Sequence, residues 1–222
     1  MIVIKGAIFD MDGVIYDGNG YVIESVKQFL SNYNVNLDNT YISEIISHSF
    51  EYTLDLLKSN HPQLKDITLI QFSQECSKTE KELMKNNVIL KKGIEKFLIN
   101  LGENGVVKGV GTASMGYRAY DILNILKVHY HFPVVVSIDD VENAKPAPDI
   151  FLEGAKRLGI EPRYFVGFED SIVGLQAIKA AGMIAIGVKS KFVDENELIK
   201  HSDFIIEDFQ NLNYNEIYKL FW

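Results

Sequence analysis

Six short, mostly apolar runs recur along the chain, and they limit its fold more than any other feature of the sequence. They cover residues 3–10, 106–112, 133–139, 163–170, 183–188 and 202–208. Runs of this length that are rich in β-branched residues are typical of strands buried in a sheet. Helical patterns precede or follow them. Strands that alternate with helices predict an α/β fold, in which helices cover both faces of a parallel sheet.

The helical patterns between these runs support the same fold. Apolar residues of 94–101 recur at i, i+3, i+4 and i+7, the spacing of a helix that buries one face. A similar stripe occurs over 148–158, and another helix is predicted over 171–181, ended by Gly182. We therefore expect a Rossmann-like, doubly wound sheet with its functional site at the carboxyl ends of the strands.

Residues 17–89 interrupt the alternation, because they have helical periodicity and no convincing buried strand. The predicted organisation is an α-helical cap domain over 17–89, inserted into a Rossmann-like core domain made of residues 1–16 and 90–222. Hinges are expected near residues 16–20, where two glycines lie, and near residues 87–93. The alternative is that these helices pack directly on the sheet.

Composition excludes several classes of protein. Hydrophobic residues are 47% and charged residues 23%, which is too apolar for a disordered chain. No apolar run approaches the roughly 20 residues that span a bilayer, so we expect no membrane partner. The net charge of −8 disfavours nucleic acid as a partner. Cys76 is the single cysteine, and the first residues lack the features of a secretory signal; both favour a cytoplasmic location.

The strongest candidate site begins with two aspartates at the end of the first predicted strand. Asp10 and Asp12 are followed by Gly13, and a turn there would let both carboxylates face one crevice. Carboxylates held close together repel each other, so such a pair usually binds a cation. An aspartate is also a competent nucleophile toward phosphorus. The alternative is that Asp12 only caps a helix and Gly13 makes the turn.

Further polar groups follow other predicted strands. Thr112 and Ser114 come after the second, and their hydroxyls could donate to a phosphate or merely cap a helix. Lys145 precedes a proline that keeps it out of a helix, so it is either a directed ammonium on a rigid loop or an ordinary surface charge. Glu169 and Asp170 end the fourth strand.

Together these groups suit phosphoryl transfer. Asp10 would attack phosphorus, while Asp12 would protonate the leaving group and then activate water. Thr112 and Lys145 would bind the remaining phosphoryl oxygens. A hard cation, Mg²⁺, would be held by carboxylates and neutralise the phosphate charge.

At these residues the sequence resembles the haloacid dehalogenase-like hydrolase superfamily. The segments FDMDGVIYD, GVGTAS, AKPAPDIF and VGFEDSIVGLQAIKAAGM are similar to its four motifs, in the same order. The resemblance implies a Rossmann-like core with a helical cap inserted after the first motif. A dehalogenase is not expected, because that branch lacks the second aspartate of the first motif.

The resemblance also implies roles for single residues. Asp10 would be the nucleophile, Asp12 the general acid/base and Lys145 the bridging cation; Thr112 would bind phosphate, and we place Ala113 beside it. Mg²⁺ would be held by the Asp10 carboxylate, the backbone carbonyl of Asp12, and Asp170, with Glu169 as a direct or water-mediated ligand.

Within the superfamily the sequence is most similar to the β-phosphoglucomutase-like branch, which also contains sugar-phosphate and phosphoglycolate phosphatases. Mutases in that branch hold a second phosphate with a cap arginine and a Ser-Lys-Asn run. The corresponding run here is Ser114-Met115-Gly116, and residues 17–89 contain no arginine. The hinge differs too, with Gly18 in place of a threonine and Val22 in place of a histidine.

These differences favour hydrolysis. The expected function is Mg²⁺-dependent removal of phosphate from a small phosphorylated metabolite, a sugar phosphate or phosphoglycolate-like compound, through an aspartyl-phosphate. A phosphosugar mutase is the alternative. A phosphorylatable receiver domain would carry its acceptor on a middle strand, and a non-catalytic phosphate-binding protein would be expected to lack a catalytic group. With 11 tyrosines and 13 phenylalanines available for a contact face, we expect a monomer or weak homodimer.

Overall fold

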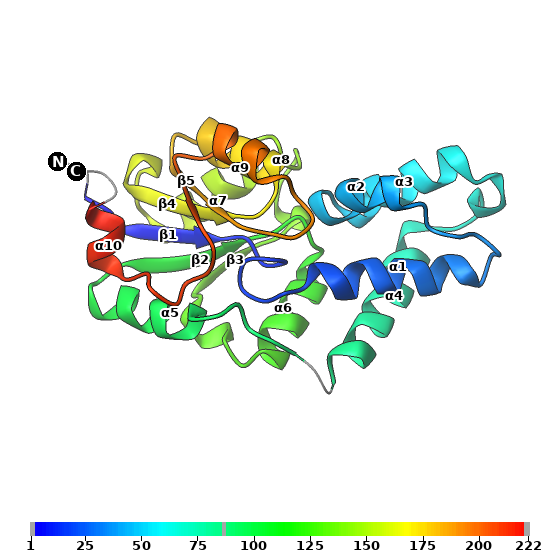
Figure 1. The fold of residues 1–222 in the computed structure, drawn as a ribbon, viewed down its shortest axis with the longest axis horizontal. Helices are drawn as coiled ribbons and strands as arrows, with labels where there is room; N and C mark the ends of the chain where they lie inside the picture. Colours follow the sequence, from blue (N-terminus) through cyan, green and yellow to red (C-terminus); the bar gives the residue numbers. More distant parts are fainter. Residues whose placement is uncertain (1–2, 86–87, 220–222) are drawn as a thin grey trace.

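The computed structural model describes residues 3–85 and 88–219, and within them the chain forms a 6-stranded parallel sheet with helices on both faces (Figure 1). The strands are β1 (Gly6–Phe9), β2 (Val107–Gly111), β3 (Val134–Val136), β4 (Phe165–Glu169), β5 (Ile184–Val188) and β6 (Phe204–Ile206). Their order is β3-β2-β1-β4-β5-β6, with every neighbouring pair parallel. This order confirms the predicted Rossmann-like, doubly wound fold, and each predicted strand is present.

Helices of the sheet domain cover its two faces in separate groups (Figure 1). On one face lie α5 (Ile94–Glu103), α6 (Gly116–Ile125) and α10 (Tyr214–Lys219). On the other lie α7 (Asp149–Leu158), α8 (Ile172–Ala180) and α9 (Glu195–His201). The three helices that the sequence predicts correspond to α5, α7 and α8. Gly182 follows α8 with a φ of 73°, the left-handed conformation of a helix-ending glycine.

The centre of the sheet is β1, which is buried on both faces. Its side chains alternate, so that Ala7 and Phe9 pack toward α5 and α6 while Ile8 packs toward α7 and α8. The rings of Phe9 and Phe168 stack with centroids 4.6 Å apart. The N–H of Asp10 then donates to the carbonyl of Phe168 at 2.9 Å. Asp10 therefore directly follows a strand that is buried on both faces of the sheet.

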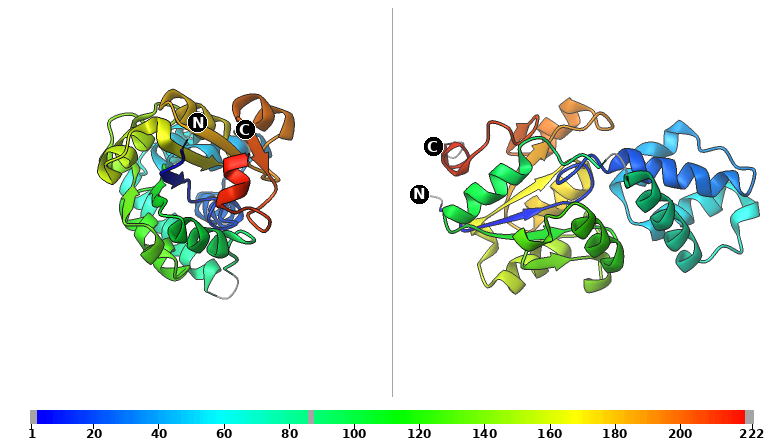
Figure 2. Two further views of the ribbon diagram at one scale, coloured as in Figure 1. Left: turned by 90° about the vertical axis from the view of Figure 1, so that its left-hand side faces the viewer. Right: turned by 90° about the horizontal axis from the view of Figure 1, so that it is seen from below.

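A helical lobe, which we define as residues 19–84, lies beyond the carboxyl ends of the strands (Figures 1 and 2). Its α helices within the described residues are α1 (Asn19–Ser31), α2 (Ile42–Ser47), α3 (Phe50–Asn60) and α4 (Leu69–Met84). They pack mainly on one another around buried side chains such as Leu30, Leu54 and Phe72. No helix among the described residues is both long and apolar enough to cross a membrane.

This arrangement is the one expected for an inserted cap, and the domain boundaries at residues 16/17 and 89/90 stay a prediction. The predicted hinge near residues 87–93 lies only partly within the described residues, since Asn87 is not among them. The predicted hinge at residues 16–20 overlaps the start of α1, whose first residue is Asn19.

Close packing at β1 predicts that replacing Gly6 by alanine destabilises the protein. A Cβ added at Gly6 would lie 2.1 Å from Cε1 of the buried Phe165 ring, so backbone or ring must move. We expect a loss of about 2–3 kcal/mol in the free energy of unfolding, measured by urea denaturation.

The matched control is Gly20→Ala in α1, because a Cβ there has nothing within 4 Å. Alanine favours helix over glycine, so this variant should be neutral or more stable by up to about 1 kcal/mol. Equal unfolding midpoints for the two variants would contradict the prediction.

Candidate active site

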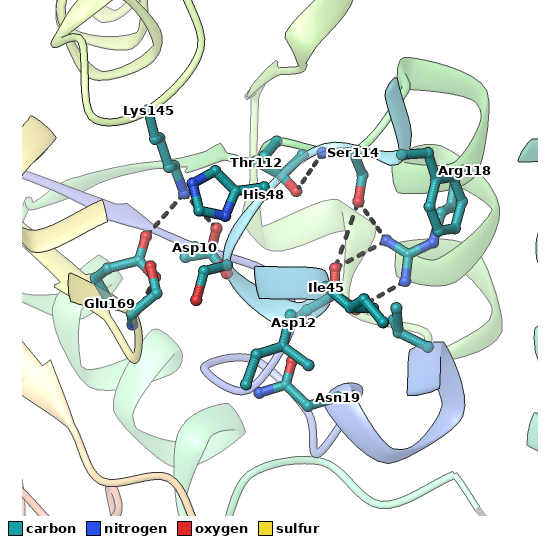
Figure 3. Close-up of a pocket in the computed structure, with 16 residues that line it drawn as sticks. Asp10, Asp12, Asn19, Ile45, His48, Thr112, Ser114, Arg118, Lys145 and Glu169 are labelled. Carbon is teal, nitrogen blue, oxygen red and sulfur yellow. Dashed lines mark hydrogen bonds and ion pairs between the residues drawn. The ribbon is translucent and has the colours of Figure 1, made fainter. Parts of the chain in front are cut away.

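A pocket lies at the carboxyl end of the sheet, facing the helical lobe (Figure 3). The sheet domain contributes the residues after β1 and β2, the loop before α7 and the end of β4. The lobe contributes α1, α2 and the start of α3. The pocket is lined by Asp10, Asp12, Asn19, Val22, Ile45, Ile46, Ser47, His48, Phe50, Thr112, Ala113, Ser114, Arg118, Lys145, Glu169 and Ser171. The predicted site residues therefore meet in space, and Asp170 lies beside them.

Lys145 connects two of the predicted carboxylates. Its Nζ donates to Oδ1 of Asp10 at 2.5 Å and to Oε2 of Glu169 at 2.7 Å (Figure 3). All three side chains are buried, with Lys145 only 3% exposed. The ammonium is therefore directed into the pocket, and it is not the surface charge that the sequence alone allowed.

Glu169 is held by the two residues that follow it and lead into α8. Its Oε1 accepts from the N–H of Asp170 at 3.1 Å, and from the N–H and hydroxyl of Ser171 at 3.1 and 2.9 Å. Ser171 also caps the helix, because its hydroxyl accepts from the N–H of Gly174 at 3.1 Å. A Cβ at Gly174 would lie 1.9 Å from Oε2 of Glu169, so the glycine makes room for this carboxylate.

Asp170 contacts the lobe as well as the turn after β1. Its Oδ2 accepts from Nδ2 of Asn19 at 2.8 Å. A Cβ at Gly13 would lie 2.0 Å from the same oxygen, and the φ of Gly13 is 82°, so glycine is required there on two grounds. Burial, followed by repulsion from Glu169, raises the pKa of Asp170 to about 8. The same two causes raise the pKa of Asp10 well above its ordinary value.

These carboxylates fit a divalent cation. One ligand oxygen from each of Asp10, Glu169 and Asp170 lies within 4.8 Å of the others, and all three residues are buried. When all three carboxylates are ionised, the single ammonium of Lys145 leaves two negative charges to be balanced. Oδ1 of Asn19, at the edge of this cluster, is buried without a hydrogen-bond partner among the described residues. A hard cation such as Mg²⁺, which prefers oxygen ligands, would balance this charge.

Asp12 points away from that cluster and forms an ion pair that sequence reasoning missed. Nη1 and Nη2 of Arg118 each donate to its carboxylate at 2.8 Å (Figure 3). The hydroxyl of Tyr16 also donates to it, at 2.6 Å. Burial acts to raise the pKa of Asp12, but the guanidinium and these hydrogen bonds outweigh it and hold that pKa below its ordinary value. Arg118 is one of three arginines in the sequence and follows Ser114 by one helical turn, the only signal that could have indicated it.

The predicted phosphate-binding residues line the wall formed by the end of β2. Thr112 is buried, and its hydroxyl accepts from the N–H of Ser114 at 3.1 Å. The hydroxyl proton of Thr112 thus remains available to a phosphoryl oxygen. Ala113 lies between them on the same wall of the pocket.

Comparison with known proteins identifies the family. The statistical model of the haloacid dehalogenase-like hydrolases matches residues 7–188. The chain belongs to this family. Among the similar relatives of this hydrolase is the fructose-1-phosphate phosphatase YqaB of Escherichia coli, 30% identical over 83% of the chain and 96% of the relative. The β-phosphoglucomutase of Bacillus subtilis is 28% identical over 83% of the chain and 83% of the relative.

A solved structure shares the fold of this hydrolase. β-Phosphoglucomutase from Clostridium difficile superposes with a TM-score of 0.87 at 24% identity, over 99% of the chain and 97% of that structure. Phosphatases and phosphomutases thus both occur among the proteins that this family member is similar to, and the phosphatase interpretation fits them.

The raised pKa of Asp170 predicts how stability changes with pH and Mg²⁺. Between its ordinary pKa of 3.8 and about 8, the folded protein holds a proton that the unfolded chain releases. This group therefore makes the metal-free protein less stable as the pH rises through that range. A cation that binds the ionised carboxylate should offset the loss, so Mg²⁺ should raise the melting temperature by about 5 °C at pH 8 and by less than half as much at pH 6.

Thermal unfolding with Mg²⁺ or with EDTA at both pH values measures this difference. Asp170→Asn is the control, since it removes both the titrating group and a ligand and should abolish most of the Mg²⁺ effect. An equal shift at pH 6 and pH 8 in the unsubstituted protein would count against the prediction.

Proposed function

We propose that this hydrolase is a Mg²⁺-dependent phosphatase that releases phosphate from a small phosphorylated metabolite, a sugar phosphate or phosphoglycolate-like compound. The observation that carries the proposal is the buried Asp10 carboxylate. It accepts from the Lys145 ammonium, has an oxygen within 4.8 Å of ligand oxygens of Glu169 and Asp170, and lines a pocket that Thr112 also lines. The names of similar proteins, which include phosphatases of phosphorylated sugars, support the substrate class.

In the proposed reaction, Lys145 and the Thr112 hydroxyl bind the phosphoryl oxygens and orient phosphorus toward Asp10. The Asp10 carboxylate attacks and the bond from phosphorus to the ester oxygen breaks. The negative charge of the bound phosphate opposes the effect of Arg118 on the pKa of Asp12, and Asp12 in its protonated form gives its proton to the departing alcohol. Asp12 then takes a proton from water, which attacks the aspartyl-phosphate and releases inorganic phosphate. Mg²⁺ bound by Asp10, Asp170, the Asp12 carbonyl and Glu169 would supply neutralisation of the phosphate charge. The lobe covers the site and limits access of water.

The wall opposite the phosphate site supports hydrolysis over mutase activity. Among the described residues, the pocket lining contributed by the lobe contains no lysine or arginine. Arg118 reaches the pocket from α6, but its guanidinium is already paired with Asp12 and Glu80. A second phosphate group would therefore find no free cation on this wall. Of the lobe residues, His48 and Phe50 are the aromatic ones that line the pocket, and we propose that they contact the organic part of the substrate.

A substrate panel tests this proposal. Sugar monophosphates and short phosphorylated acids are incubated with Mg²⁺ or with EDTA, and inorganic phosphate is measured. We expect Mg²⁺-dependent release from at least one of these compounds. No release from any of them would contradict the proposal.

The mutase alternative has its own assay. β-Glucose 1-phosphate is supplied with glucose 1,6-bisphosphate, and glucose 6-phosphate and inorganic phosphate are both quantified. A phosphatase should form phosphate and little glucose 6-phosphate. Formation of glucose 6-phosphate faster than phosphate would favour the mutase.

The remaining expectations from the sequence also stay proposals. We propose a cytoplasmic protein that is a monomer or weak homodimer and has no nucleic-acid or membrane partner. The net charge of −8 and the single cysteine support the location and the absence of a nucleic-acid partner. Size-exclusion chromatography with light scattering would measure the oligomeric state, and a stable oligomer larger than a dimer would contradict this part of the proposal.

A further inference from the structure

A buried cluster of charged groups surrounds the carboxylate of Asp12. Arg118, at its centre, is 2% exposed, and Glu80 from α4 of the lobe is 1% exposed. Nε of Arg118 donates to Oε2 of Glu80 at 2.7 Å, and Nη2 donates to Oε1 at 2.5 Å. The Tyr16 hydroxyl lies 3.3 Å from Oε1 of Glu80 and also donates to Asp12. We call Asp12, Tyr16, Glu80 and Arg118 the Arg118 cluster.

The cluster joins the two parts of the molecule. Within the described residues, three side-chain pairs connect α4 of the lobe with α6 of the sheet domain: Ser77 with Tyr117, Glu80 with Arg118, and Lys81 with Asp121. The partners on each helix are spaced by one, three or four residues, so one face of α4 lies along one face of α6. Only the Glu80–Arg118 pair is buried and also contacts Asp12.

The geometry of the guanidinium explains why these contacts depend on one another. One edge of the planar fork, formed by Nη1 and Nη2, faces Asp12, and the other edge, formed by Nε and Nη2, faces Glu80. A buried ion pair that loses one partner leaves an uncompensated charge, which is strongly destabilising. Moving α4 away from α6 would take Glu80 from Arg118 and admit water to the ion pair that holds Asp12.

We propose that Arg118 is a positioning residue for Asp12, and that Glu80 makes this positioning depend on the lobe being closed against the sheet domain. Alignment of the acid/base carboxylate and closure of the pocket would then occur together. The inference rests on the proposed function, because it takes Asp12 as the group that protonates the leaving alcohol.

The test compares two phosphate esters whose leaving groups differ in how much they depend on protonation by a general acid. p-Nitrophenolate is a weak base and leaves with little protonation, whereas an alkoxide such as that of glycerol phosphate requires a proton. We expect Glu80→Ala to lower kcat/KM for glycerol phosphate by tenfold or more, and for p-nitrophenyl phosphate by less than threefold. Arg118→Lys, which cannot span both carboxylates with a planar fork, should show the same selective loss.

Lys81→Ala is the matched control. It breaks the neighbouring pair between the same two helices without touching Asp12, so kcat/KM should stay within twofold for both esters. If Glu80 had only a structural role, Glu80→Ala would lower kcat/KM equally for both esters, and that result would overturn the inference. Values of kcat/KM for Glu80→Ala equal to those for Lys81→Ala would overturn it as well. Should Glu80→Ala fail to fold, the loss of kcat/KM for the two esters is compared in Glu80→Gln, which keeps the shape of the side chain and removes its charge.

Failure of the proposed function gives a different result. In that case the unsubstituted protein releases no phosphate from either ester, or Asp10→Asn releases it as fast as the unsubstituted protein. An active protein that is inactivated by Asp10→Asn, but whose Glu80 and Arg118 variants show no selectivity between the esters, contradicts the positioning role alone.

Discussion

Replacement of Asp10 by asparagine should reduce phosphate release by at least about a thousandfold, because the amide cannot form the aspartyl-phosphate. The substitution keeps the shape of a residue that is 7% exposed and packed at the end of β1. Burial and the nearby Glu169 raise the pKa of Asp10, so its ionised form is disfavoured in the metal-free protein. Asp10→Asn should therefore fold, with a melting temperature in EDTA no lower than that of the unsubstituted protein at pH 8.

Asp17→Asn is the matched control for this variant. Asp17 belongs to the same segment, but its side chain is 69% exposed and pairs with Lys91 at 3.2 Å outside the carboxylate cluster. Its kcat should stay within about twofold, as expected of an exposed pair. Phosphate release above a tenth of the normal rate in Asp10→Asn would contradict the role of Asp10.

Lys145→Met should have the second largest effect. Methionine keeps most of the side-chain length but removes the ammonium that binds Asp10 and Glu169. The loss of one preorganised charge at the reacting phosphate should lower kcat by about 10²–10³-fold. Two buried carboxylates would also lose their shared partner, so the free energy of unfolding without metal should fall by about 3 kcal/mol, with part of it restored by Mg²⁺.

Lys108→Met separates the two effects. Lys108 is 9% exposed on β2, and its Nζ donates to the carbonyl of Leu98 at 2.9 Å, away from the pocket. This variant should lose about 1–2 kcal/mol of stability and keep kcat within twofold. If both lysine variants lose activity only in proportion to their stability, Lys145 has no role in the reaction.

The candidate site could be predicted largely because of where its residues lie on the strands. Asp10, Thr112 and Glu169 each stand at or directly after the carboxyl end of a strand, and parallel strands bring these ends to one edge of the sheet. Local sequence patterns therefore predict that these residues lie close together. Lys145 lies farther along the loop between β3 and α7, and its direction into the pocket rests on the bonds to Asp10 and Glu169.

The contacts around Asp12 could not be predicted from local sequence patterns. Arg118 is 106 residues from Asp12 in sequence and 38 from Glu80, and none of the three lies at a spacing that predicts the others. Their meeting depends on how α4 of the lobe packs against α6. That packing also buries Arg118.

Strand and helix content and the parallel sheet follow from short apolar runs and from apolar residues spaced for a helix, and the polar groups of the site follow directly after such runs. These are properties of short segments and can be recognised in the linear chain. Other features arise only when distant helices pack. They are the ion pair of Asp12, the side-chain pairs between α4 and α6, and, among the described residues, the absence of a free cation from the part of the pocket that the lobe lines. Side-chain contacts of this kind depend on the relative position of whole elements, and a local pattern carries no information about that position.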